Sequence, residues 1–134
     1  MQRRKARETA LQALFQVDVG KIPADAAVMY AIAFNDLSED TAVFSRSIVE
    51  GVTTYQEQID EAISQWAVDW SLERLANVDR NILRIAFYEL LFCPEIPEGV
   101  AISEAVEIAK DFGDDDSSRF VNGILGQFSR DRRG

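Results

Sequence analysis

The run NVDRNILRIAFYELLF at residues 77–92 constrains the fold more than any other part of the chain. Drawn as a helix, it carries apolar residues on nearly every side: Val78, Ile82, Leu83, Ile85, Ala86, Phe87, Leu90, Leu91 and Phe92. A helix that is apolar nearly all round is buried, so this segment is expected at the centre of the molecule. Pro94 and Pro97 end the helix and force an extended link.

The other segments mostly show the three-four spacing of apolar residues that is typical of amphipathic helices. The expected helices are one that closes at Gly20, one over 24–37, one that follows an N-cap at Ser38, one over 59–66, one over 101–112 that stops at Gly113, and a last one capped by Ser117. Residues 66–70 alternate like a strand, but without a partner strand the case is weak. The sequence predicts an all-α bundle of six or seven helices.

The residue types narrow the chemistry. The chain has no histidine and a single cysteine, Cys93, so it lacks the commonest general base and metal ligand and cannot form an internal disulfide. The acids Asp114–Asp116 share one solvated helix start, and Glu89 in the apolar run is best explained by a structural hydrogen bond. We therefore expect no enzyme activity, no cofactor and no metal site.

The length and the apolar pattern bound the class of protein. A chain of 134 residues suits a single domain over 1–134 with a real core. No stretch approaches the length of a membrane span, and the lone cysteine suits a reducing compartment. We expect a cytoplasmic protein with no membrane partner.

The formal net charge of −9 conceals an uneven distribution of charge. Residues 22–73 hold ten acids and one base, Arg46, so this segment alone accounts for −9. The rest of the chain is neutral, and its bases cluster within 3–7, 74–84 and 130–133. This asymmetry predicts a local basic face on an acidic body. The acidic segment is a candidate surface for a basic partner or simply a solvated face.

The first basic cluster has three explanations: a solvated tail, a helix end decorated for solubility, or a surface for polyanions. Its cations oppose the helix macrodipole, and the acidic body does not need them for solubility. Both observations favour the third explanation, a surface that binds polyanions. Arginine also binds phosphate through its planar fork. Arg80 and Arg84 are expected on an exposed helical stripe with Tyr88, and Arg119 precedes Phe120 in a pairing suited to phosphate and base stacking. Phe120 can instead be core beside Ile124.

Three segments together resemble the NusB family of bacterial transcription antitermination factors. They are RKARETALQALFQ, VDRNILRIAFYELLF and IPEGVAISEAVEIAKDFGDDDSSRFVNGILGQF. The match covers the first helix and nearly all of the chain from Leu75 to Phe128, in order, whereas 19–70 adds little. Its most specific parts are the LRIAFYEL and FVNGIL blocks.

The resemblance implies an all-helical fold of about seven helices in two small sub-bundles. It also implies a transcription antitermination factor that binds the single-stranded boxA element of nascent ribosomal RNA together with a small-subunit ribosomal protein, NusE. That complex joins NusA, NusG and RNA polymerase, and elongation then resists premature termination.

The resemblance also implies particular RNA-binding residues. They are Arg3, Arg4, Lys5 and Arg7 in the arginine-rich segment, Phe15 in the first helix, Asp79 before LRIA, and Asp116, Arg119 and Phe120 in the DSxxF element; Arg80 joins them from its stripe. Phe15 stands where tyrosine is common and lacks its hydroxyl, while Ser103 and Gly126 replace a usual asparagine and a frequent acid. Four cations on single-stranded RNA predict a slope of log affinity against log salt of about −3.

Two rival functions remain open at this point. NusB-like domains also precede some ribosomal RNA methyltransferases, although the chain stops at Gly134 and leaves no room for that domain. Alternatively, the chain is a homodimeric protein-interaction module whose helical surface contacts only protein.

Overall fold

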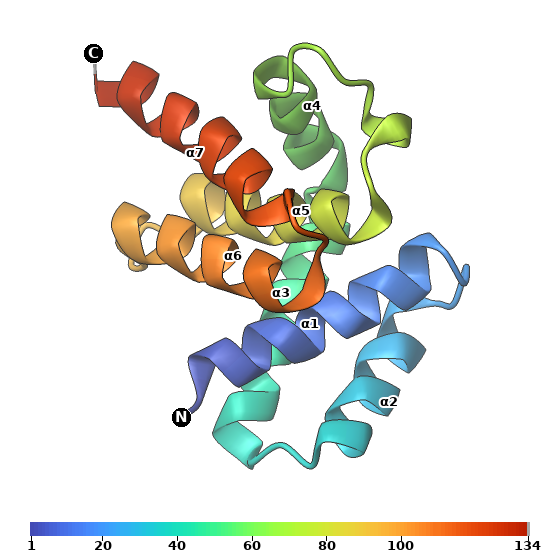
Figure 1. The fold of residues 1–134 in the computed structure, drawn as a ribbon. Coiled ribbons are helices and arrows are strands. Elements are labelled where there is room, and N and C mark those ends of the chain that lie inside the picture. The colour runs from blue at the N-terminus through green and yellow to red at the C-terminus, as the bar shows by residue number, and fades with distance from the viewer. Residues whose placement is uncertain (134) are drawn as a thin grey trace. The chain divides into compact units, whose positions relative to one another are not determined.

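The computed structural model describes residues 1–133, and within them the chain is helical with no strand. It contains the α-helices α1 (Arg3–Asp18), α2 (Ala24–Asn35), α3 (Glu39–Thr54), α4 (Gln56–Trp66), α5 (Asn77–Phe92), α6 (Glu98–Phe112) and α7 (Ser117–Arg133), and the short 3₁₀ helix η1 (Leu72–Arg74). The all-α prediction is confirmed (Figure 1). The alternating residues 66–70 lie in the end of α4 and the turn after it. No helix within this described part is long and apolar enough to cross a bilayer.

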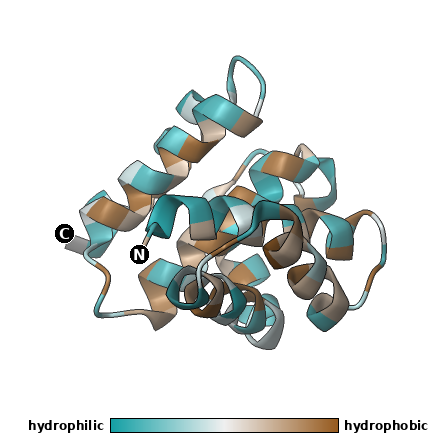
Figure 2. Ribbon diagram, turned by 90° about the horizontal axis from the view of Figure 1, so that it is seen from below, coloured by the Kyte–Doolittle hydropathy of each residue, from teal (hydrophilic) through white to brown (hydrophobic). Residues whose placement is uncertain are grey.

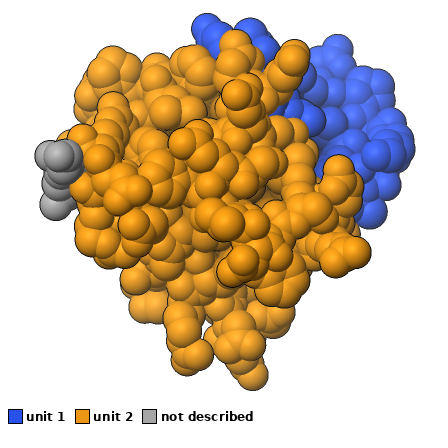
Figure 3. Space-filling model, turned by 90° about the horizontal axis from the view of Figure 1, so that it is seen from above, with its two compact units in different colours: residues 1–56 blue, residues 57–134 orange. Residues whose placement is uncertain are grey.

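The helices form two compact units, which confirms the expected pair of sub-bundles (Figure 3). Unit 1 covers Met1–Gln56 and holds α1, α2 and α3. Unit 2 begins at Glu57 and holds the other helices. In both, hydrophilic and hydrophobic residues are interspersed along the helices (Figure 2). That the two units make one domain over 1–134 stays a prediction.

In unit 1, α1 packs against both α2 and α3 (Figure 1). Small residues on α1 permit close approach, since Ala6, Ala10 and Ala13 are fully buried. Leu14 of α1 and Val52 of α3 are among the other buried apolar residues of this unit. The first helix of the chain is therefore fixed along its length by two neighbours.

In unit 2, α5 is the central element, as its apolar run predicted. Of its sixteen residues eleven are buried, and it contacts both α6 and α7. The ring of Phe87 meets Phe128 of α7 at 5.2 Å between centroids, and Phe128 in turn meets Trp66 of α4 at 5.7 Å. These edge-to-face contacts join three helices through one aromatic cluster.

The corner between α6 and α7 depends on Gly113. Ser117 is the first residue of α7, and its hydroxyl accepts a hydrogen bond from the Asp114 N–H at 2.9 Å, so it bonds the loop rather than serving as the expected N-cap. A Cβ on Gly113 would overlap the Ser117 side chain and approach the Ala109 carbonyl oxygen at 2.9 Å. The corner is thus too tight for any side chain at position 113.

Gly113→Ala is therefore expected to destabilise the protein by about 1–3 kcal/mol, the usual cost of overpacking. Thermal or urea unfolding of the variant measures this loss. Gly99→Ala is the matched control, because a Cβ at Gly99 meets nothing within 4 Å. Equal stability of the two variants would contradict the packing argument.

Candidate nucleic-acid interface

The basic cluster near the N-terminus is the first turn of a helix, because α1 begins at Arg3. Arg3, Arg4 and Lys5 are exposed, as a surface for polyanions requires. Arg7 differs: its side chain is only 2% exposed and its guanidinium lies over the ring of Phe44, 5.5 Å from the centroid. The expectation that all four cations are presented together is wrong for Arg7, because the helical turn directs it toward α3.

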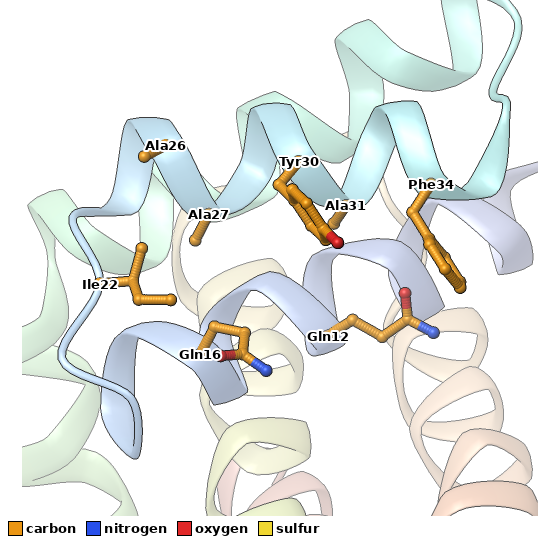
Figure 4. Close-up of a pocket in the computed structure, with 8 residues that line it drawn as sticks. All are labelled: Gln12, Gln16, Ile22, Ala26, Ala27, Tyr30, Ala31 and Phe34. Carbon is orange, nitrogen blue, oxygen red and sulfur yellow. The ribbon is translucent and has the colours of Figure 1, made fainter.

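Phe15 lies in the last part of α1 and is half-buried. The side of α1 that carries Gln12 and Gln16 borders a groove of about 610 Å³ against α2, lined by Gln12, Gln16, Ile22, Ala26, Ala27, Tyr30, Ala31 and Phe34 (Figure 4). Tyr30 and Phe34 point toward α1 and are each 75% exposed. None of the predicted RNA-binding residues lines this groove, so its aromatic side chains serve below as controls.

In unit 2, three of the predicted RNA-binding residues meet in one groove of about 310 Å³. It is lined by Trp70, Arg74, Leu75, Ala76, Asp79, Asp114, Asp116 and Phe120. Asp79 comes from the first turn of α5, Phe120 from the first turn of α7, and Asp116 from the loop before it. Asp79 thus shares one surface with residues of a segment far from it in the sequence, and we call this surface the base groove.

Two aromatic side chains line the base groove. The rings of Trp70 and Phe120 meet edge to face, with centroids 6.1 Å apart and planes at 80°. Trp70 is 51% exposed, an unusual state for so large an apolar side chain, and Phe120 is half-buried. Exposed aromatic faces of this kind stack nucleobases.

Trp70 and Arg74 also line the base groove, although the sequence analysis did not place them among the candidate site residues. The signal lay in the WAVDW segment, which was weighed only as a weak strand. An isolated tryptophan between two helices, with a basic residue four positions later, carries no helical stripe that would assign it to a core. Arg74 adds a cation to a groove that otherwise holds three carboxylates.

Asp79 is the most constrained polar group of the base groove. Its side chain is 7% exposed, and its Oδ1 has no hydrogen-bond partner among residues 1–133. Burial raises the pKa of Asp79, the nearby Asp114 charge raises it further, and a hydrogen bond from Ser117 partly offsets both. A buried acceptor without a donor lowers stability, because the cost of removing it from water is not repaid by a hydrogen bond.

We expect Asp79→Asn to increase stability at pH 7, by about 1 kcal/mol, because it removes a buried charge and keeps the acceptor for Ser117. The raised pKa means that the folded protein holds the proton more tightly than the unfolded chain. Proton binding by Asp79 therefore stabilises the wild-type protein fully below the ordinary pKa of 3.8. This contribution is lost as the pH rises through the raised pKa of the folded state. Melting curves between pH 3 and pH 8 should show the variant's advantage growing with pH; a variant that is less stable at pH 7 contradicts this account.

The expectation that Arg80 and Arg84 line an exposed stripe with Tyr88 is wrong. Both arginines are buried, at 8% and 7% exposure, and Tyr88 is half-buried. Arg84 makes a two-pronged ion pair with Asp60 of α4, with Nε–Oδ1 at 2.9 Å and Nη2–Oδ2 at 3.1 Å. The helical stripe was correctly identified, but neighbouring segments cover it and use its cations.

Arg80 fixes the loop that carries the base groove. Its guanidinium donates to the carbonyl oxygens of Leu72 at 3.1 Å and Leu75 at 3.3 Å, and to Asn77 Oδ1 at 2.5 Å. These bonds hold η1, and with it Arg74, against the start of α5. The structure therefore gives Arg80 a supporting position beside the groove, and a direct contact of Arg80 with RNA stays a prediction.

Arg119 forms an exposed ion pair with Asp116, which lines the base groove. Their side chains are 87% and 85% exposed, and their charged atoms are 3.9 Å apart. An ion pair this exposed contributes little to stability, so Arg119 remains available to a phosphate. Asp114 Oδ1 accepts from the Asp116 N–H at 2.9 Å, which accounts for the acidic run as a turn before α7. Within residues 1–133 no three potential metal ligands cluster.

The fold is all-helical, with a cationic helical turn in unit 1 and, in unit 2, an aromatic groove that holds one buried acceptor, a combination typical of proteins that bind nucleic acid. Comparison with known proteins agrees: the NusB family matches residues 4–130. Transcription antitermination protein NusB of Bacillus subtilis is 48% identical over 131 residues, 98% of this chain and 97% of its own length. The protein of the same name from Heliobacterium modesticaldum is 48% identical over 133 residues, 99% of this chain, which spans only 65% of that relative.

A solved structure of antitermination factors NusB and NusE in complex with dsRNA superposes with a TM-score of 0.89 at 25% identity, covering 98% of this chain and 99% of that one. The chain belongs to the NusB family. Its function is that of a transcription antitermination factor, as the resemblance of the three segments implied.

Proposed function

We propose that the chain binds the boxA element of nascent ribosomal RNA together with NusE. The observation that carries the proposal is the presence of two kinds of surface, one in each unit: exposed Arg3, Arg4 and Lys5 on α1, and the base groove with Phe120 and a buried acceptor. A structure of a related NusB with NusE and double-stranded RNA supports the choice of partners.

The two surfaces divide the work. Cations supply affinity and orientation through phosphates but read no sequence, whereas stacking and bonds to base edges provide specificity. We assign the phosphates to Arg3, Arg4, Lys5 and Arg119, with Phe15 on the same helix as the first three. The bases fall to Asp79, Asp116 and Phe120, joined by Trp70 and Arg74, while Arg7 and Arg80 support the two surfaces.

The wider assembly follows from the same proposal. We place the chain in the cytoplasm, without catalytic activity of its own, in an elongation complex that contains RNA polymerase, NusA and NusG. The acidic stretch 22–73 offers a complementary charge to a basic ribosomal protein such as NusE. Self-association into a homodimer would compete with this role where it covers the RNA surface.

The test is equilibrium binding of boxA RNA and of a scrambled RNA of equal length and composition, each with and without NusE. We expect boxA to be preferred, and the preference to grow when NusE is present. Light scattering of the same samples reports whether a homodimer forms and whether RNA dissolves it. Equal affinity for the two RNAs in both conditions would overturn the proposed function.

A further inference from the structure

The cationic turn of α1 contacts an aromatic residue in the first part of α3. The Arg3 guanidinium carbon lies 4.6 Å from the centroid of the Phe44 ring, and that of Arg7 lies 5.5 Å from it. One half-buried aromatic ring therefore serves two arginines that are one helical turn apart. Contacts at this distance are within the range of cation–π attraction.

Two further contacts attach the residues before Arg3 to the same part of α3. The backbone N–H of Gln2 donates to Thr41 Oγ1 at 3.2 Å, and the N-terminal ammonium lies 3.6 Å from Asp40 Oδ2. Thr41 is itself held in place, because it is 2% exposed and its hydroxyl accepts from Ser38 at 2.9 Å. Four successive attachments thus run from the chain terminus to Arg7.

These contacts matter because the turn is unfavourable on its own. Cations at a helix N-terminus oppose the macrodipole, and no acidic residue stands in the first turn of α1. Arginine-rich segments often become ordered only when they bind RNA, which reduces affinity by the entropy of ordering. A turn that is already held in its helical form avoids that loss.

We propose that Phe44 is a positioning residue for RNA binding: it holds Arg3 and Arg7 so that the basic turn is ordered before RNA arrives. This inference rests on the proposed function. In this proposal Phe44 contacts no phosphate and acts through Arg3. Thr41 and Asp40 assist by fixing the backbone that precedes Arg3.

The experiment compares Phe44→Leu, which removes the π face and keeps an apolar side chain, with Phe44→Tyr, which keeps both. For the leucine variant we expect boxA affinity to fall about threefold to thirtyfold at every salt concentration, with the salt slope unchanged because no charge is lost. The tyrosine variant should restore the affinity. Phe34→Leu on α2 is the control for an aromatic residue outside the basic turn.

A second readout needs no RNA. Backbone ¹⁵N relaxation of the free Phe44→Leu protein should show residues 2–5 becoming mobile while the rest of α1 stays ordered, and thermal melting should confirm a folded sample. If wild-type protein selects boxA but the leucine variant binds equally well and stays ordered at 2–5, the role of Phe44 is refuted and the proposed function stands. If wild-type protein does not select boxA, the proposed function itself fails. The relaxation result still decides whether Phe44 orders the turn.

Discussion

Replacing Phe120 with alanine is expected to weaken the binding of boxA RNA by about fivefold to 150-fold. Stacking of one base on an aromatic side chain contributes about 1–3 kcal/mol, and the base groove offers the faces of Phe120 and Trp70 to this purpose. Trp70→Ala should have an effect of the same size. Fluorescence anisotropy with labelled boxA RNA at fixed salt measures both.

The matched control is Phe34→Ala, because Phe34 is a 75% exposed aromatic residue on α2 that lines a different groove. We expect it to bind boxA like the wild type. Melting curves are needed for Phe120→Ala, since this side chain is half-buried, whereas the 51% exposure of Trp70 makes its substitution the cleaner test. Unchanged RNA affinity in both groove variants would remove the base groove from the interface.

Asp60→Ala is expected to lower the free energy of unfolding by about 3 kcal/mol. The substitution leaves the guanidinium of Arg84 buried without the carboxylate that now binds it in two-pronged geometry, and an uncompensated buried charge costs several kcal/mol. The effect should appear in urea unfolding followed by circular dichroism. It should affect unit 2, where Arg84 joins α5 to α4.

Two further variants separate the buried charge from the ion pair itself. In Asp60→Leu combined with Arg84→Met, both charges are gone, and we expect most of the lost stability to return. Lys110→Ala breaks the exposed pair between Lys110 and Glu107 and should change stability by less than about 0.5 kcal/mol. If Asp60→Ala costs no more than Lys110→Ala, Arg84 does not depend on its partner as described.

The architecture could be predicted well because apolar periodicity is a local property. The run at 77–92 was expected to be a central helix, and α5 spans those residues and is buried along most of its length. The same reasoning failed at Arg80 and Arg84, where it identified a polar stripe and assumed that polar means exposed. Which segment covers a helix face depends on tertiary packing, here α4 through Asp60 and the loop through Leu72.

The candidate site was predictable only in part for the same reason. Charge and the family resemblance pointed to the basic turn and to Asp79, Asp116 and Phe120, and the structure places the last three in one groove. Whether these residues bind RNA stays a prediction. The burial of Arg7 was not predictable, because it depends on Phe44, which lies far away in the sequence. The 51% exposure of Trp70 was not predictable either, because it depends on how the segments around it pack.

The central claim is that an acidic protein binds RNA phosphates through a few exposed cations, and the salt dependence of boxA binding tests it most directly. Because Arg7 is buried, three exposed cations of the turn remain. These three cations should contribute a slope of log affinity against log salt of about −2, less steep than the slope that four cations would give. Replacing Arg3, Arg4 and Lys5 with alanine should make the slope shallower by about 2 without unfolding the protein. A flat response in folded wild-type protein, or the same slope in both proteins, would contradict the account.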